Sequence, residues 1–188
     1  MGKQYQITEF CHHFLKDYIQ ENDCCIDATA GNGNDTEFLC RMAGEYGKVY
    51  AFDIQEEAVT NTRRRLEQAG LSERAVLICG GHERMLEYVR EEVAVIVFNF
   101  GYLPGGDHRI ATRAETSLPA VRQGLELLKV GGVMNLCIYS GGDTGYEERD
   151  ALLAFVKGLD TKKWLVIVSS YYNRKNDPPL PVFIIRLR

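Results

Sequence analysis

The stretch CCIDATAGNGNDT, residues 24–36, together with KVYAFDI, residues 48–54, decides the fold of this chain. Each stretch opens with a short apolar run that does not alternate with polar residues, as strands buried on both faces of a parallel sheet do. The first run ends at Asp27 and leads into a glycine-rich turn, and the second ends near Asp53. A helical pattern over 35–44 separates them. The pair therefore predicts a strand–helix–strand unit whose glycine turn lies at the carboxyl end of the first strand.

The same alternation of apolar runs and helical patterns continues along the chain. We predict strands at 24–28, 48–54, 75–79, 93–100, 132–139, 164–172 and 182–188, and helices at 7–20, 35–44, 55–69, 83–91, 113–129 and 145–159. The turn-rich segment 173–181 is too short for a parallel crossover, so the last strand returns antiparallel to its predecessor. The predicted fold is α/β: a doubly wound, Rossmann-like, seven-stranded sheet with helices on both faces and an antiparallel C-terminal β-hairpin, forming one domain over residues 1–188.

Composition narrows the function classes. The 188 residues are 45% hydrophobic and include no long uncharged apolar run or signal-peptide pattern, so we expect a soluble, cytoplasmic protein without a membrane partner. A net charge of −4 argues against bulk binding of nucleic acid but is compatible with one RNA substrate. The six cysteines form no C-x-x-C pair and the four histidines no H-x-x-x-H pair, so we expect reduced thiols and no metal.

The glycine turn and Asp53 point to a nucleoside ligand. In doubly wound sheets, ligands bind outside the carboxyl ends of the strands. Gly31 and Gly33 can adopt positive φ and admit a ligand close to the backbone, and Asn34 or Asp35 can cap the next helix. A tight structural turn would explain the glycines alone, but a carboxylate about 20 residues downstream is suited to hold ribose hydroxyls.

Three acidic or polar positions favour S-adenosylmethionine over a dinucleotide. Thr36 stands where a dinucleotide fingerprint has its third glycine, and Asp35 would repel a pyrophosphate at the helix N-terminus. Asp27 suits an ammonium group near the glycines. The alternative from another class is a Rossmann-type NAD-binding oxidoreductase.

The end of the fourth predicted strand carries the candidate reaction centre. Asn99-Phe-Gly-Tyr102 resembles the D/N-P-P-Y/F/W motif of amino-group methyltransferases, with both prolines replaced. The Asn99 carboxamide oxygen can accept an N–H from a substrate amine and orient its lone pair, and Tyr102 can stack on a base. An aspartate at position 99 would keep an oxygen acceptor, so we expect it to retain more activity than alanine. A plain loop with the turn residues Pro104-Gly105-Gly106 is the alternative.

Five segments together resemble one known family. DATAGNGNDTEFL, YAFDIQ, NFGYLPGGDH, YSGGDTGYEER and NRKNDPPLPVF are similar to the small bacterial "putative rRNA methylase" family, and the resemblance covers nearly the whole chain. It implies a class I methyltransferase fold with S-adenosylmethionine as cofactor and S-adenosylhomocysteine as product. It also implies methylation of the amine of 5-aminomethyl-(2-thio)uridine at the tRNA wobble position, as in Gram-positive members, and often a homodimer.

The resemblance and the residue pattern together define the candidate site. The expected cofactor-binding residues are Asp27, Gly31, Asn32, Gly33, Asn34, Asp35, Thr36, Asp53, Gln55, Gly81, His82 and Asn99, with Asn99 and Tyr102 as the catalytic residues. The expected residues for the tRNA anticodon stem-loop are Gly101, His108, Arg109, Arg113, Asp143 and Tyr146.

Some assignments stay open at the level of sequence. Asp107, His108, Asp143 and Tyr146 are unranked candidates for a general base. Arg63, Arg64 and Arg65 are expected on a solvated helix face. An rRNA base methyltransferase and a non-catalytic RNA-binding protein are the remaining alternatives.

Overall fold

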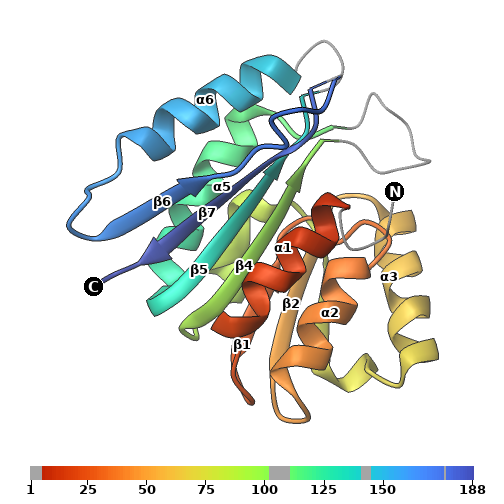
Figure 1. Ribbon diagram of the computed structural model, residues 1–188. Helices are drawn as coiled ribbons and strands as arrows, with labels where there is room; N and C mark the ends of the chain where they lie inside the picture. Colours follow the sequence, from red (N-terminus) through yellow and green to blue (C-terminus); the bar gives the residue numbers. More distant parts are fainter. Residues whose placement is uncertain (1–5, 102–110, 141–144, 176) are drawn as a thin grey trace.

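The computed structural model describes residues 6–101, 111–140, 145–175 and 177–188 and has one mixed sheet at its centre (Figure 1). The strand order is β3-β2-β1-β4-β5-β7-β6. The strands are β1 (Cys24–Asp27), β2 (Lys48–Asp53), β3 (Ala75–Cys79), β4 (Val93–Phe100), β5 (Leu128–Ile138), β6 (Trp164–Val168) and β7 (Leu180–Arg186). Strands β1 to β5 pair in parallel, whereas β7 runs antiparallel to both β5 and β6. The prediction of an antiparallel terminal hairpin is confirmed.

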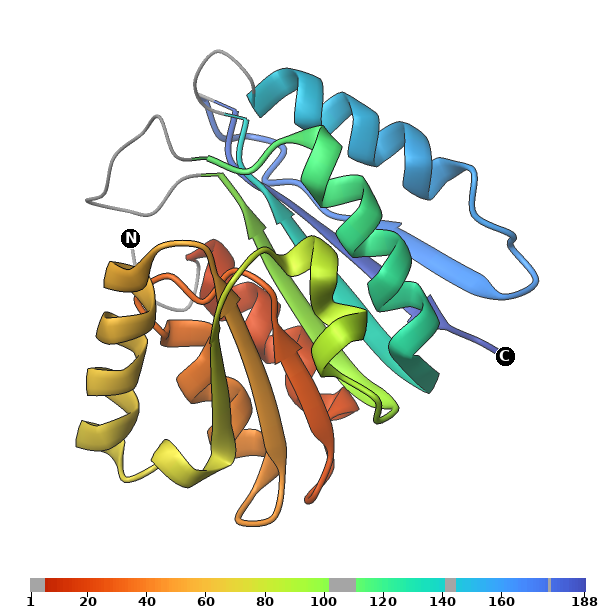
Figure 2. The same ribbon diagram turned by 180° about the vertical axis from the view of Figure 1, so that it is seen from behind.

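Helices cover the two faces of the sheet. The helices are α1 (Ile7–Leu15), α2 (Asn34–Ala43), α3 (Glu56–Ala69), α4 (Met85–Tyr88), α5 (Ala114–Leu127) and α6 (Gly145–Lys157), with short 3-10 turns η2 (Lys16–Tyr18), η3 (Ser72–Arg74) and η4 (His82–Arg84). Figure 1 shows α1 and α2 in front of the sheet, and Figure 2 shows α4, α5 and α6 on the opposite face. The predicted α/β, doubly wound class is therefore correct.

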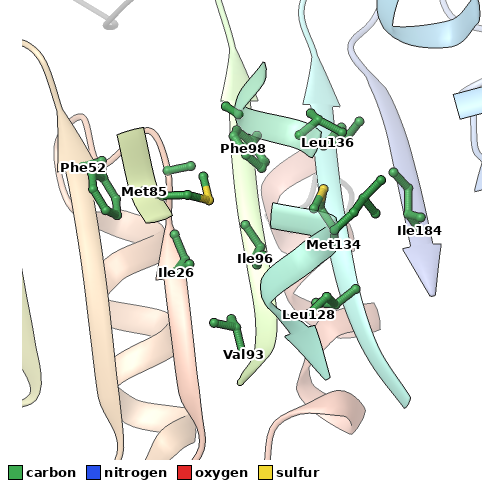
Figure 3. Packing of buried hydrophobic residues seen from close by; sticks show 14 of the residues in the cluster. Ile26, Phe52, Met85, Val93, Ile96, Phe98, Leu128, Met134, Leu136 and Ile184 are labelled. Atoms are coloured by element: carbon green, nitrogen blue, oxygen red, sulfur yellow. The ribbon is translucent and has the colours of Figure 1, made fainter. Parts of the chain in front are cut away.

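Each face of the sheet has its own buried apolar cluster. On the side of α4, α5 and α6, side chains such as Ile96, Met85 and Met134 pack together with no exposed surface (Figure 3). On the other side, Leu15 of α1, Leu39 of α2 and Leu66 of α3 pack on the sheet. Burying both faces explains why the central strands read as continuous apolar runs.

Several predicted boundaries differ from the structure. Helix α5 ends at Leu127, and β5 begins at Leu128 instead of at the predicted residue 132. The reason is that Leu128 is buried and pairs with Val93 of β4, after which the register of the two strands shifts. The predicted helix 83–91 is only η4 followed by α4, since the backbone is already extended at Val89. The predicted first helix is interrupted after Leu15, and the predicted strand 164–172 ends at Val168. Within the described ranges, no helix has the length and apolarity needed to cross a membrane.

Candidate active site

A cavity of about 520 Å³ opens at the carboxyl ends of β1, β2, β3 and β4. This is the edge of the sheet at which doubly wound folds bind their ligands. Its lining consists of Ala28, Thr29, Gly31, Asp53, Ile54, Gln55, Gly80, Gly81, His82, Glu83, Asn99, Gly101, Ala111, Thr112, Arg113, Glu115 and Thr116. The cavity thus brings together five separate segments of the chain.

The glycine turn forms one wall of this cavity and is held by helix α3. Gly31 and Gly33 have φ values of 53° and 77°, which confirms the positive φ expected for both. A Cβ at Gly33 would lie 2.9 Å from the Cα of Thr62, so only glycine fits there. The Thr62 hydroxyl donates to the Gly31 carbonyl at 3.1 Å, and Arg65 Nε donates to the Asn32 carbonyl at 2.7 Å.

Arg65 therefore has a structural role that the sequence did not reveal. We expected a solvated helix face, yet its guanidinium bonds the loop carbonyl and also pairs with Glu37 at 3.0 Å. Thr62 and Arg65 lie three positions apart, hence on one side of α3, and this spacing is the only signal that could have linked them. Arg63 and Arg64 are exposed, as expected.

Asp53 connects the end of β2 to the glycine turn. Its Oδ2 accepts the Gly31 N–H at 2.9 Å and its Oδ1 accepts the Gln55 N–H at 3.0 Å. The side chain lies on the cavity wall beside Gln55. Because each carboxylate oxygen has a further lone pair, both can still accept hydroxyl donors from a ligand.

Asp27 was expected to bind the cofactor, but its side chain lies beneath the glycine turn and is not part of the cavity wall. It is fully buried and accepts the Thr36 hydroxyl at 2.6 Å and the Thr29 N–H at 3.2 Å. Burial, together with the charge of Asp35, raises the Asp27 pKa to about 7. Thr36, which stands where a dinucleotide-binding fold has its third glycine, thus holds the Asp27 side chain in place. A contact between Asp27 and a ligand stays a prediction.

His82 joins the loops that follow β3 and β1. Its Nδ1 lies 3.0 Å from the Ala28 carbonyl, and its ring meets Phe98 and Phe100 edge-on. Burial lowers the His82 pKa, so a neutral ring that donates from Nδ1 fits this pocket. His82 and Gly81 both line the cavity, where the expected cofactor-binding residues Asp53 and Asn99 also lie.

Asn99 is held on both its backbone and its side chain. Its N–H donates to the Thr29 hydroxyl at 2.7 Å. Its carboxamide Nδ2 donates to Asp35 Oδ2 at 2.6 Å, and the other Asp35 oxygen lies 2.6 Å from His12 Nε2. The residue lines the cavity next to Gly101, as expected for a group at the reaction centre.

Gly101 is fixed through a buried network that the sequence did not reveal. Its N–H donates to the Thr112 hydroxyl at 2.8 Å, which in turn donates to Glu148 Oε2 at 2.9 Å. Ser117 donates to the other Glu148 oxygen at 2.5 Å. Burial of this carboxyl group raises the Glu148 pKa. Helix α6 thereby anchors both chain segments that flank residues 102–110.

The other expected site residues are distributed as follows. Gly31, Asp53, Gln55, Gly81, His82, Asn99, Gly101 and Arg113 line the cavity, whereas Asn32 and Asn34 face an outer groove behind the glycine turn. Tyr146 is the second residue of α6. Its side chain is exposed, its hydroxyl donates to Asp177 at 2.7 Å, and the Arg149 guanidinium lies over its ring. Tyr102, Asp107, His108, Arg109 and Asp143 lie outside the described residues.

Among the residues that the structure describes, the thiols and the metal-ligating side chains form no separate site. All six cysteines are free, and Cys79 is the exposed one among them. In the part of the chain that the structure covers, no three His, Cys, Asp or Glu side chains gather as metal ligands would.

Comparisons with known proteins identify similar chains. A family described as "Putative rRNA methylase" matches residues 49–185. The chain is 37% identical to the Arabidopsis thaliana protein named tRNA (mnm5s2U34)-methyltransferase, chloroplastic, over 96% of this chain and 69% of the relative.

Solved structures are similar over almost their full length. The structure of a "putative rRNA-methylase" from Clostridium thermocellum is 44% identical with a TM-score of 0.94, covering 96% of this chain and 97% of that one. The structure of a "putative methyltransferase" from Streptococcus mutans in complex with SAH is 41% identical with a TM-score of 0.88, again covering 96% of this chain and 97% of that one.

Proposed function

Because the chain belongs to the "putative rRNA methylase" family, we propose that it is an S-adenosylmethionine-dependent tRNA methyltransferase. Its proposed target is the amine of 5-aminomethyl-(2-thio)uridine at the wobble position, within the anticodon stem-loop. The plant relative is named for a reaction at this nucleotide, and the Streptococcus mutans relative is in complex with SAH. The observation that carries the proposal is the cavity in which Asp53, the glycine turn and Asn99 meet.

The cavity lining fits the parts of S-adenosylmethionine. The Asp53 carboxylate, preset by Gly31 and Gln55, is suited to accept hydrogen bonds from the two ribose hydroxyls. The apolar and aromatic surroundings of His82 suit an adenine ring. When bound, the cofactor supplies an electrophilic methyl group on a sulfonium sulfur. The nearby buried carboxyl group of Asp27 favours a cationic ligand.

The residues of the chain have to present a neutral amine to that methyl group. An alkyl ammonium ion has no lone pair, and the loss of water on binding, together with a neighbouring sulfonium charge, lowers its pKa and favours the neutral form. Asn99 oxygen then accepts one amine N–H and aims the lone pair. Holding the two reactants in this orientation supplies much of the rate acceleration without a covalent intermediate.

The RNA-binding surface is proposed to surround the cavity mouth. Arg113 lies on the cavity wall at the start of α5, where its guanidinium can reach a phosphate group. Tyr146 at the start of α6 offers an exposed ring on the neighbouring segment. A homodimer stays a prediction from the family resemblance, and light scattering of the purified protein can check it.

Methylation of defined RNA tests the proposal. Transfer RNA and ribosomal RNA from a strain that lacks this gene are incubated separately with the protein and S-adenosylmethionine, and the nucleosides of each are analysed by mass spectrometry. We expect 5-aminomethyl-type uridine to be converted to its N-methyl derivative. Unchanged tRNA alongside methylated rRNA would support the rRNA alternative instead. In a thermal-shift assay, stabilisation by NAD but not by S-adenosylhomocysteine would overturn the cofactor assignment.

A further inference from the structure

A chain of three side chains leads from the N-terminal helix to the proposed reaction centre. His12 of α1 contacts Asp35 Oδ1, and Asn99 Nδ2 donates to Asp35 Oδ2, both at 2.6 Å. These residues belong to α1, α2 and β4, so the chain joins three elements. His12 and Asp35 are largely buried, with exposed side-chain fractions of 18% and 13%. Hydrogen bonds to a charged group in such surroundings are short and strong.

The chemistry of Asp35 decides which end of the Asn99 carboxamide it takes. An ionised carboxylate has acceptors only, whereas a carboxamide has donors on nitrogen and acceptors on oxygen. Asp35 can therefore bind the amide nitrogen of Asn99 but not its oxygen. Because the two ends of a carboxamide are nearly the same size, packing alone would not choose between them. The Asp35 contact makes that choice and turns the Asn99 oxygen away from α2.

His12 in turn holds the Asp35 carboxylate in place. The His12 ring stacks on Phe38, with centroids 3.9 Å apart and ring planes within 4°. A stacked ring has a fixed plane, so its Nε2 points along a fixed direction to Asp35. Both the protonated imidazole and the neutral ring with a proton on Nε2 can donate here. With Oδ1 bound to His12 and Oδ2 to Asn99, the carboxylate has little freedom to rotate.

Helix α1 is itself anchored to the sheet. Cys11 and Leu15 are buried against it, and Phe14 stacks on Phe183 of β7 with centroids 4.0 Å apart. The position of His12 is thus set by the core and not by a mobile surface contact.

We propose that Asp35, held by His12, is a positioning residue that fixes the Asn99 carboxamide with its oxygen toward the substrate amine. This inference rests on the proposed function of Asn99. Asp35 is not among the residues that line the cavity, and a direct contact between Asp35 and the cofactor stays a prediction. The inference also changes the outcome expected for Asn99→Asp. In that variant two carboxylates, at positions 35 and 99, would lie about as close together as the hydrogen-bonded pair does now, so one of them must bind a proton.

Exchanging the two partners tests the proposal. Asp35→Asn and Asn99→Asp are measured singly and together, at saturating S-adenosylmethionine and tRNA. Each single variant should lower kcat by about 10-fold or more, while cofactor affinity by calorimetry changes by less than about 3-fold. The double variant restores an amide–carboxylate pair and presents an oxygen to the amine, so its kcat should exceed that of both single variants. Additive losses in the double variant would overturn the proposal.

Variants at His12 separate hydrogen bonding from packing. His12→Phe keeps a ring on Phe38 but removes the donor, and His12→Gln keeps a donor. We expect lower kcat for His12→Phe with partial recovery in His12→Gln, and no effect for His13→Ala, the exposed neighbour. Equal kcat values for the wild type and His12→Phe would contradict the role of His12.

The side-chain amide resonances of Asn99 report on the pairing without any activity. In ¹H–¹⁵N spectra, one Asn99 amide proton should lie downfield and move upfield in Asp35→Asn. An unshifted resonance would overturn the proposal even if the protein methylates another RNA. Absence of wild-type methylation of 5-aminomethyl-type tRNA, with the shift present, would instead reject the proposed function and leave the pairing established.

Discussion

The carboxylate of Asp53 accepts the backbone N–H of Gly31 at 2.9 Å and so ties the end of β2 to the turn after β1. The residues are 22 positions apart in the chain, yet they form one rigid wall of the cavity. A ligand that spans this wall meets a preformed surface and loses less affinity to ordering of the protein.

Removing the Asp53 carboxylate should weaken cofactor binding. Asp53→Ala removes the proposed acceptor for the ribose hydroxyls and frees the Gly31 N–H. Hydrogen bonds to charged groups contribute about 1.5–3 kcal/mol, so we expect about 10- to 150-fold weaker binding of S-adenosylmethionine. Calorimetric titration of the folded variant measures this. Wild-type affinity would remove Asp53 from the binding site.

Substitution of Gly33 should reduce both stability and cofactor affinity. Gly33→Ala places a methyl group 2.9 Å from the Thr62 backbone at φ 77°, so the turn has to shift. Gly70→Ala is the matched control, because Gly70 has φ 68° but nothing within 4 Å of the added Cβ. We expect Gly70→Ala to cost roughly 1 kcal/mol of backbone strain and Gly33→Ala clearly more. Chemical denaturation gives both values, and equal losses would mean that contact with Thr62 is unimportant.

Removing the contact between Arg65 and the glycine turn should weaken binding of S-adenosylmethionine. Arg65→Ala frees the Asn32 carbonyl, so the turn loses one of its fixed contacts. Loss of one such hydrogen bond corresponds to about 0.5–1.5 kcal/mol, or roughly 2- to 12-fold weaker S-adenosylmethionine binding. Arg63→Ala, on the exposed side of the same helix, should bind normally. If both variants bind equally well, α3 does not brace the turn.

Binding of a cationic ligand should release a proton from Asp27 near neutral pH. The folded-state pKa of Asp27 is raised from 3.8 to about 7, chiefly by burial. The stabilising contribution of this group is therefore complete below its ordinary pKa and is lost as the pH rises through about 7. A nearby positive charge lowers that pKa, so S-adenosylmethionine should displace protons at pH 7.

Calorimetry in two buffers of different ionisation enthalpy measures this release. S-adenosylhomocysteine lacks the sulfonium charge and should release fewer protons, and Asp27→Asn should abolish the effect. Identical binding enthalpies in the two buffers near pH 7 would contradict the prediction.

Reversing the charge at Arg113 should weaken tRNA binding selectively. Arg113→Glu removes the proposed phosphate contact at the cavity mouth, so affinity for tRNA should fall and its dependence on salt should flatten. Arg64→Glu, on the far side of the glycine turn, should have a much smaller effect. Filter binding at several salt concentrations compares the two. A larger loss in Arg64→Glu would place the RNA on the other face.

The sequence predicted the sheet, its terminal hairpin and the position of the cavity because these depend on local patterns. Apolar runs mark the strands, and Gly31 and Asp53 mark the carboxyl ends at which ligands bind. The helix boundary at Leu127 was misplaced because pairing of Leu128 with Val93 is a tertiary interaction that periodicity does not encode.

The contacts that hold the site in place were not evident from the sequence for the same reason. In the sequence, Arg65 is one of three adjacent arginines with no sign of a partner, and only the fold places the Asn32 carbonyl within hydrogen-bonding distance of it. Likewise, His12, Asp35 and Asn99 are separated by 23 and 64 positions and meet only through the fold. A sequence pattern more readily identifies the residues that face a ligand than the residues that hold those ligand-facing side chains in position.

The position of β7 has a consequence for how the chain acquires its structure during synthesis. Strand β7 follows β6 in the sequence but lies between β5 and β6, and β6 pairs with β7. As the chain leaves the ribosome, β1 to β5 can assemble progressively, whereas β6 has no edge to join until residues 180–186 have emerged. Strands β7 and β6, two of the seven, therefore have to join the sheet together in one late step, and until then β5 presents an open edge to other chains in the cell.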